Sequence, residues 1–273
     1  PSSKEVDQLI LDQVTSDYRL SDLICTPQIK ESLDHFILEH RKKNLLQALD
    51  LPIAHKILFY GPSGCGKTLA SYVIAGELEK ILLVVNLGAI VSSKLGETSK
   101  NLAKIFKMAA SGDYILFLDE FDSLGKVRDY SQDHGEMKRV VNTILQLFDY
   151  LPQSTIVIAA TNQVGMLDDA LIRRFDTQIE FELPTDHEIE ELIQLTLKRG
   201  VFTLDSKSGI KRLIQKAKGL SFYSIQKTLI AAMKRSLYKL ETDLVPAKVE
   251  IDKAIWEKLI EEEKTAISNS GKV

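Results

Sequence analysis

The segment from residue 61 to residue 69 has the residue types and the spacing that bind a polyphosphate. It reads Gly61-Pro62-Ser63-Gly64-Cys65-Gly66-Lys67-Thr68-Leu69, and its first eight residues fit the pattern G-x-x-x-x-G-K-[ST]. Glycines let backbone N–H groups turn toward anionic oxygens without a clash of Cβ atoms. We predict that Lys67 reaches the outer phosphates and that the Thr68 hydroxyl is a ligand of Mg²⁺. The alternative, a glycine-rich turn without function, is disfavoured by a preceding apolar run and a following helical pattern.

Two adjacent acidic residues follow a second apolar run, Ile115–Leu118. Neighbouring residues on a strand point to opposite faces, so Asp119 and Glu120 can have different roles. We expect Asp119 to hold Mg²⁺ and Glu120 to polarise the attacking water. A pair of acids at a strand end is often merely solvated, but its position downstream of the phosphate segment favours nucleotide hydrolysis over that interpretation.

Three further residues are candidates for contacts with the γ-phosphate. Asn162 follows the apolar run Ile156–Ala160, where an amide could bind the phosphate or the lytic water, although Asn is also a common turn residue. Arg173 and Arg174 could neutralise charge on the leaving phosphate across a subunit boundary, which requires an oligomer. A solvated basic edge is the alternative for this arginine pair.

The elements around these residues predict an α/β fold. Apolar runs predict strands at Ile57–Tyr60, Ile81–Asn86, Tyr114–Leu118, Thr155–Ala160 and Gln178–Phe181. Helical spacing of apolar residues predicts helices at 27–50, 67–79, 98–110 and around 137–148. Strands that alternate with helices imply right-handed crossovers, and hence a P-loop type parallel sheet with helices on both faces.

The pattern changes after Pro184. Residues 187–199, 207–218, 221–240 and 252–263 are all helical in their spacing, and no strand is evident among them. We therefore expect two domains, a nucleotide-binding α/β domain at 1–184 and a small all-helical lid domain at 185–273.

Composition gives no support to several classes of protein. The 273 residues carry a formal net charge of −3, which gives no argument for binding nucleic acid or an anionic membrane. No apolar run approaches the roughly 18–20 residues that span a bilayer. The two cysteines, Cys25 and Cys65, form no disulfide framework, and the reduced thiols suggest the cytoplasm.

The order of these motifs resembles the AAA ATPase family, over roughly residues 18–240. By this resemblance Lys67 and Thr68 match Walker A, Asp119 and Glu120 match Walker B, Asn162 matches sensor 1, and Arg173 and Arg174 match the arginine fingers. Ile24, in Asp22-Leu23-Ile24, takes the place of the segment that lies against adenine.

The resemblance implies ATP and Mg²⁺ as ligands and a homo-oligomeric ring, usually a hexamer. It also implies that ATP hydrolysis remodels a protein substrate, with a protease as a conceivable partner in trans. Two positions depart from the family: Lys94 replaces the pore-loop aromatic, and Phe222-Tyr223 replaces a Gly-Ala pair in the lid, where no arginine serves as a second sensor. These variations resemble the stand-alone prokaryotic members, which have one ATPase domain.

Two other functions remain open at this stage. A nucleic-acid motor or loader is disfavoured by the near-neutral charge and by the lack of a basic-aromatic groove pattern. A nucleotide-gated scaffold is disfavoured by the intact Glu120 and the arginine pair. A built-in metalloprotease is disfavoured because His187-Glu188 is not followed by a histidine at position 191.

Overall fold

The computed structural model describes residues 10–87, 95–126, 134–198, 200–204, 207–240 and 244–270. The chain divides into two compact units. The first comprises Pro1–Gly61 and Gly66–Phe181, and the second comprises Pro62–Cys65 and Glu182–Val273. Each unit is described separately below.

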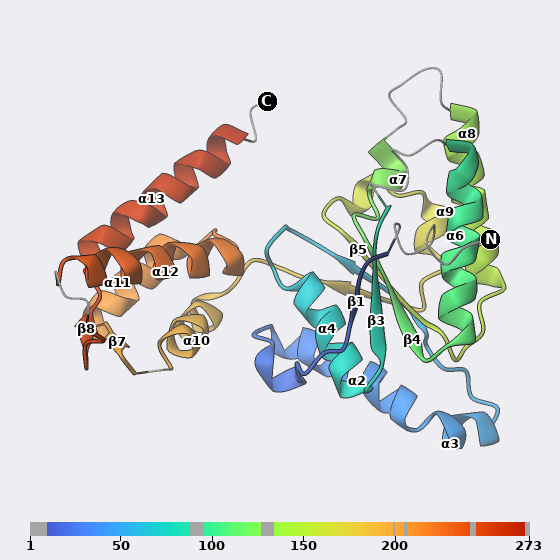
Figure 1. Ribbon diagram of the computed structural model, residues 1–273, viewed down its shortest axis with the longest axis horizontal. Helices are drawn as coiled ribbons and strands as arrows, with labels where there is room; N and C mark the ends of the chain where they lie inside the picture. Colours follow the sequence, from blue (N-terminus) through green and yellow to red (C-terminus); the bar gives the residue numbers. More distant parts are fainter. Residues whose placement is uncertain are drawn as a thin grey trace. The chain divides into compact units, whose positions relative to one another are not determined.

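A six-stranded sheet forms the centre of the first unit (Figure 1). Its strands are β1 (Ile10–Val14), β2 (Lys56–Tyr60), β3 (Ile81–Asn86), β4 (Tyr114–Asp119), β5 (Ile156–Thr161) and β6 (Thr177–Glu180). They lie in the order β1-β3-β4-β5-β2-β6, and every pairing except that of β1 with β3 is parallel. The predicted α/β fold class is confirmed.

The edge strand β1 was not predicted. It pairs antiparallel with β3 and has an irregular register between Ile10 and Asp12. Its three middle residues are exposed, so the segment lacks the continuous apolar run by which the buried strands are recognised.

Helices cover both faces of this sheet (Figure 1). Their bounds are η1 (Leu20–Asp22), α2 (Pro27–Arg41), α3 (Lys43–Ala48), α4 (Lys67–Glu77), α6 (Leu95–Ser111), α7 (Ser123–Lys126), α8 (His134–Asp149), η3 (Val164–Met166) and α9 (Asp169–Ile172). Helices α2 and α4 pack on one face, while α6 and α8 pack against each other on the opposite face. Parallel strands covered on both faces account for the uninterrupted apolar runs in the sequence.

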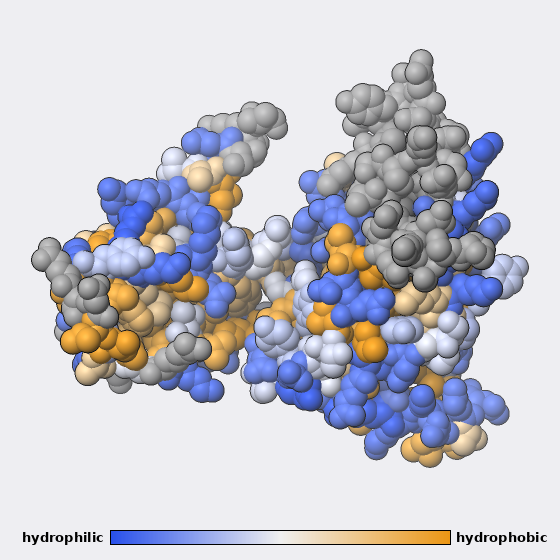
Figure 2. Space-filling model, viewed as in Figure 1, coloured by the Kyte–Doolittle hydropathy of each residue, from blue (hydrophilic) through white to orange (hydrophobic). Residues whose placement is uncertain are grey.

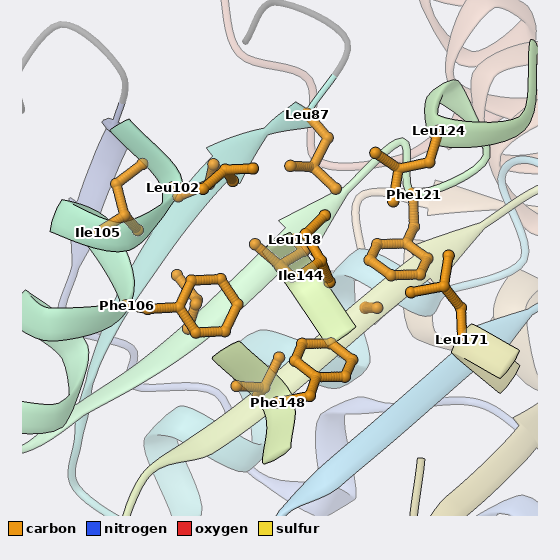
Figure 3. Packing of buried hydrophobic residues seen from close by; sticks show 14 of the residues in the cluster. Leu87, Leu102, Ile105, Phe106, Leu118, Phe121, Leu124, Ile144, Phe148 and Leu171 are labelled. Carbon is orange, nitrogen blue, oxygen red and sulfur yellow. The ribbon is translucent and has the colours of Figure 1, made fainter. Parts of the chain in front are cut away.

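The face under α6 and α8 carries an apolar core. Phe106 from α6, Phe148 from α8 and Phe121 from the loop after β4 are all buried there (Figure 3). Phe121 stacks parallel to Phe148 at a centroid distance of 6.5 Å, and Phe175 packs edge-on against both rings. Aromatic side chains bury large areas in fixed geometry, so this cluster holds the loop after β4 firmly.

The prediction of a single helix over residues 27–50 is wrong in the number of helices. The chain forms two helices, α2 and α3, which are separated at Lys42, where φ is −103° and ψ is 18°. As a result Leu45 and Leu49 are 56% and 61% exposed instead of continuing the buried stripe of α2. On the face shown in Figure 2, a small hydrophobic patch lies at the place of α3 in Figure 1, and the surface next to it is mainly hydrophilic.

The second unit is a small helical bundle with one addition. Its helices are α10 (Asp186–Leu197), α11 (Lys207–Ala217), α12 (Phe222–Tyr238) and α13 (Lys253–Ser270). Trp256 is fully buried among them and donates a hydrogen bond from its indole N–H to Thr228. The unit is not purely helical, because β7 (Phe202–Thr203) and β8 (Val249–Glu250) form a short parallel pair that the sequence did not predict. Strands of two residues carry too little periodicity to be recognised.

Two buried histidines stabilise the amino end of β2. His40 Nε2 lies 2.7 Å from the carbonyl oxygen of Ala54, so this nitrogen carries the proton and donates it. His55 Nε2 lies 3.1 Å from Lys56 Nζ, an ammonium group that can only donate, so His55 holds its proton on Nδ1. Burial lowers the pKa of both histidines below the ordinary value of 6.5; the carbonyl of Ala54 opposes this shift for His40, and the carboxylate of Asp176 opposes it for His55.

These lowered pKa values predict a pH-dependent stability. Below pH 6.5 the unfolded chain takes up protons that the folded protein excludes, so acid favours unfolding. The free energy of unfolding should therefore fall as the pH is lowered from about 7.5 to about 5.5. Each histidine contributes at most about 1.4 kcal/mol per pH unit to this fall. Denaturant unfolding across this range would measure it. His40→Gln should reduce the slope, whereas His35→Gln, at an exposed position of the same helix, should not. Equal slopes in both variants would contradict the assignment.

Candidate functional site

The phosphate segment connects β2 to α4, as the sequence predicts. Gly61, Gly64 and Gly66 have φ values of 129°, 75° and 99°, which residues with a Cβ atom rarely adopt. A Cβ atom on Gly61 would also lie 2.0 Å from the carbonyl oxygen of Phe181. The loop therefore requires glycine for its backbone conformation and for its close approach to the chain after β6. Gly66 is the N-cap of α4, so the positive end of that helix faces the loop.

Lys67 and Thr68 occupy the first turn of α4. Lys67 is only 8% exposed, and its Nζ donates to the carbonyl oxygen of Gly61 at 2.7 Å. The Lys67 side chain thus links the end of the loop to its first residue, Gly61. Thr68 is exposed, and its carbonyl oxygen accepts a hydrogen bond from Ser71.

The middle of the loop, Pro62–Cys65, groups with the second unit. Within that unit the backbone N–H of Tyr223 donates to the carbonyl oxygen of Gly64 at 3.1 Å. A Cβ atom on Gly64 would lie 2.7 Å from Oγ of Ser221, the N-cap of α12. The Phe222-Tyr223 pair, which departs from the resembled family, thus begins the helix that contacts this part of the loop.

Asp119 and Glu120 stand at the carboxyl end of β4. Burial raises the pKa of the Asp119 carboxyl, and the Glu120 and Asp122 carboxylates act in the same direction, while the Lys67 ammonium opposes them. The Glu120 N–H donates to Asp119 Oδ1 at 2.8 Å. Glu120 has a φ of 52°, a left-handed conformation that is uncommon for a residue with a side chain, and it is exposed. Strained backbone of this kind is frequent at functional sites.

Asn162 lies at the same edge of the sheet. Strand β5 pairs in parallel with β4 on one side and with β2 on the other, and Tyr60 is opposite Thr161. The residues that follow β2, β5 and β4 therefore leave the sheet together. Two strand spacings, about 10 Å, separate β2 from β4, with Asn162 between the phosphate loop and Glu120. Its side chain is exposed at that edge.

The segment that resembles an adenine contact also lies near the loop. Leu23 is 5% exposed, and its Cδ1 would be 3.5 Å from a Cβ atom placed on Gly66. Ile24, the predicted contact residue, is half-buried beside it. The chain before α2 therefore runs along the last part of the phosphate loop.

Arg173 and Arg174 are not brought to this edge within the chain. Asp176, two residues later, accepts hydrogen bonds from the N–H groups of His55 and Lys56 at the amino end of β2. Five strand residues, about 16 Å, separate that end from Gly61. The arginine pair is therefore near the edge opposite Glu120.

The two arginines also differ from each other. Arg174 forms a two-pronged ion pair with Asp149, with its Nε 3.1 Å from Oδ1 and its Nη2 3.2 Å from Oδ2. These hydrogen bonds lower the pKa of the Asp149 carboxyl and raise that of Arg174. Arg173 is exposed. The sequence did not indicate Asp149 as a partner, because the two residues are far apart along the chain.

Lys94, the predicted pore-loop residue, lies outside the described residues. Two other residues near the site, Asp122 and Thr161, received no role from the sequence. Both are buried at the ends of β4 and β5, and the Thr161 hydroxyl donates to Asp122 at 3.2 Å. The sequence held one signal that could have indicated Asp122. It is the third acid in Asp119-Glu120-Phe121-Asp122, and it directly follows an apolar residue.

The donor set suits Mg²⁺. A threonine hydroxyl and a carboxylate are oxygen ligands of the kind that this hard cation prefers, and Thr68 and Asp119 supply them at one edge of the sheet. Within the described residues, no group of three or more His, Cys, Asp or Glu side chains could hold a metal ion. Mg²⁺ does not require such a group, because it is commonly bound through one or two carboxylates together with substrate phosphates and water.

A parallel sheet with a glycine-rich loop between β2 and α4, and with acids at the end of β4, defines a P-loop nucleotide-binding protein. The family model described as "ATPase family associated with various cellular activities (AAA)" matches residues 57–183. The chain belongs to the AAA ATPase family, because one relative named as such is 34% identical over 82% of this chain and 67% of its own length. That relative is an uncharacterized AAA family ATPase of Sinorhizobium fredii.

Other relatives are longer than this chain. A putative 26S proteasome regulatory subunit homolog of Methanocaldococcus jannaschii is 35% identical over 66% of the chain and 49% of its own length. A spastin homolog of Caenorhabditis elegans is 32% identical over 72% of the chain and 40% of its own length. The crystal structure of the FIGL-1 AAA domain matches with a TM-score of 0.76 over 99% of this chain and 95% of its own, at 18% identity, and thus shares the fold.

No helix in the described part of the chain is both long and apolar enough to cross a membrane.

Proposed function

We propose that this protein hydrolyses ATP to ADP and phosphate in an Mg²⁺-dependent reaction. The observation that carries the proposal is the convergence of Lys67, Glu120 and Asn162 at the carboxyl edge of adjacent parallel strands. Ligands of open α/β sheets bind at this edge. In the proposal, the α/β domain predicted at 1–184 binds the nucleotide, and the helical domain predicted at 185–273 forms its lid.

Each side chain has a distinct task in the proposed reaction. The glycine loop and the positive end of α4 bind the phosphates, and Lys67 neutralises part of their charge. Mg²⁺, held by Thr68 and Asp119, would supply electrostatic stabilisation of charge on the phosphate oxygens. Glu120 orients a water molecule and accepts its proton as the water attacks the γ-phosphate. Asn162 donates a hydrogen bond to the phosphate or the water.

An assembly of several copies completes the proposed site. Arg173 and Arg174 lie near the amino edge of their own sheet, so neither reaches Glu120 of the same chain. In the proposal, the two arginines enter the nucleotide site of a neighbouring copy of the chain. Their positive charge stabilises the transition state there, which is the role of an arginine finger. We propose a homo-oligomeric ring, with a hexamer as the expected form.

The proposed substrate of this ring is a protein. Two relatives support it through their names, a 26S proteasome regulatory subunit homolog and a spastin homolog. The net charge of −3 gives no electrostatic basis for binding nucleic acid.

A trapping experiment tests this function. The Glu120→Gln variant is purified from cells in buffers that contain ATP and Mg²⁺. The mass of the assembly, the bound nucleotide and the co-purifying molecules are then determined. An oligomer that retains ATP and a protein supports the proposal. Co-purified nucleic acid in place of protein, or a wild-type enzyme that releases no phosphate from ATP with Mg²⁺, contradicts it.

Shared sites predict complementation between inactive subunits. Arg174→Ala removes the finger of one subunit, and Glu120→Gln disables the water-activating acid of another. The mixture should recover measurable phosphate release, because some sites then combine an intact Glu120 with an intact Arg174. The Arg174–Asp149 pair is exposed, so its loss should hardly affect stability.

The control is Arg174→Ala alone at the same total protein concentration. Light scattering monitors assembly in the control and in the mixture. No recovery in mixed assemblies would argue that Arg174 does not act in trans.

A further inference from the structure

A buried hydrogen-bond bridge joins the loops that follow β4 and β5. Thr161 Oγ1 donates to Asp122 Oδ1 at 3.2 Å, and the N–H of Gln163 donates to the same hydroxyl at 3.0 Å. Asp122 and Thr161 are only 2% and 1% exposed. The Thr161 hydroxyl therefore uses its proton toward one loop and a lone pair toward the other. We call Asp122 and Thr161 the bridging pair.

The bridging pair is placed between the two groups that the proposed reaction requires. Glu120 lies two residues before Asp122, and Asn162 directly follows Thr161. The N–H of Phe121 also donates to the carbonyl oxygen of Ala160 at 2.9 Å, which extends the pairing of β4 with β5 past the end of the sheet. The two loops are thus tied together directly after Glu120 and directly before Asn162.

The loop after β4 is itself anchored in the core. Phe121 is fully buried in the aromatic cluster with Phe148 and Phe175, as Figure 3 shows for the first two. The N–H of Ser123 donates to the carbonyl oxygen of Glu120 at 2.9 Å and closes the turn. Because this side is held firmly, a link from Asp122 can fix the position of the loop after β5.

We propose that Asp122 and Thr161 are positioning residues that hold Asn162 at a set place relative to Glu120, and that they thereby determine the rate of hydrolysis but not the affinity for ATP. The inference rests on the proposed function and assigns it two residues with no contact to the nucleotide. A shift of about 1 Å in a reacting group can cost up to about 100-fold in rate. A buried hydroxyl-to-carboxyl bridge keeps such a shift from occurring.

Thr161→Val tests this role, because valine is close to threonine in size and lacks the hydroxyl that makes both hydrogen bonds. The kcat for phosphate release should fall about 10-fold or more, while the dissociation constant for ATP stays within about 2-fold. Thr161→Ser, which restores the hydroxyl, should recover most of the lost kcat. Thr155→Val is the matched control: Thr155 is 2% exposed and directly precedes β5 at the opposite end, so its kcat should not change.

A double-variant comparison separates positioning from a general loss of structure. If Thr161 acts through Asn162, then adding Thr161→Val to Asn162→Ala should lower kcat by less than 2-fold further, because the amide that it positions is already absent. Asp122→Ala should behave in the same way in this background. Thermal unfolding of every variant confirms folding, and Thr161→Ala, which lacks the hydroxyl in a smaller side chain, replaces Thr161→Val should the latter not fold.

Three results would overturn the inference: an unchanged kcat in Thr161→Val, a full additional loss in the Asn162→Ala background, or no rescue by serine. They differ from a failure of the proposed function, which would appear in the wild-type protein as an absence of phosphate release from ATP. A wild type that is active, together with a Glu120→Gln variant that is inactive, establishes the reaction independently of the bridging pair.

Discussion

Replacing Lys67 with alanine is expected to abolish ATP binding at physiological nucleotide concentration. The ammonium group is the one positive side chain of the phosphate loop, and charge-assisted hydrogen bonds of this kind contribute about 1.5–3 kcal/mol each. Losing two of them corresponds to a fall in affinity of about 100-fold or more. Titration calorimetry with ATP and Mg²⁺ measures the effect directly.

The structure shows how to separate this loss from a change in the fold. Lys67 is almost fully buried and also donates to the carbonyl oxygen of Gly61, so alanine removes packing as well as charge. Lys67→Met keeps an unbranched side chain of similar length and removes the ammonium group alone. Lys30→Ala removes one positive charge from an exposed site on α2 and should leave binding unchanged. If Lys67→Met bound ATP as tightly as the wild type, the assignment of the phosphate loop would be wrong.

The second large effect is expected for Glu120→Gln. A neutral amide cannot accept the proton of the attacking water, and a general base commonly contributes about 100-fold to 10,000-fold in rate. Phosphate release should therefore slow by at least about 100-fold, while ATP affinity stays within about 3-fold of the wild type. Single-turnover hydrolysis and equilibrium binding measure the two quantities separately.

The same sheet supplies a matched control for this variant. Glu180 ends strand β6, is exposed, and accepts a hydrogen bond from the hydroxyl of Tyr60 at 3.4 Å. Glu180→Gln makes the identical chemical change at the carboxyl end of another strand of the same sheet, and its turnover should equal that of the wild type. Turnover at the wild-type rate in Glu120→Gln would mean that another group activates the water.

Much of the first unit could be predicted because its local signals agree with its fold. The five parallel strands lie within one residue of their predicted ends. Four of them, β2 to β5, are largely buried and therefore leave continuous apolar runs. Strand β1 and the short pair β7 and β8 could not be predicted, because an exposed edge strand and strands of two residues have no such run. The periodicity of apolar residues also failed to predict the break between α2 and α3 at Lys42, because the apolar spacing continues there although the helix does not.

The candidate site divides in a similar way between sequence and structure. The order and chemistry of Gly61–Thr68, Asp119-Glu120 and Asn162 are local, so the sequence by itself determined which side chains are available. The spatial order of the strands is not local: β5 lies between β2 and β4, although β3 follows β2 along the chain. That order places Asn162 between the phosphate loop and Glu120.

The tertiary structure alone decided which distant residues meet. Thr161 and Asp122 are 39 positions apart in the chain, and Arg174 and Asp149 are 25 apart, so neither pairing follows from a motif. The physical reason is that a motif records residues joined by the backbone, whereas a hydrogen bond between loops depends on how sheets and helices pack. Thus the sequence indicated which side chains are available in this AAA ATPase family member, and packing determined which of them meet.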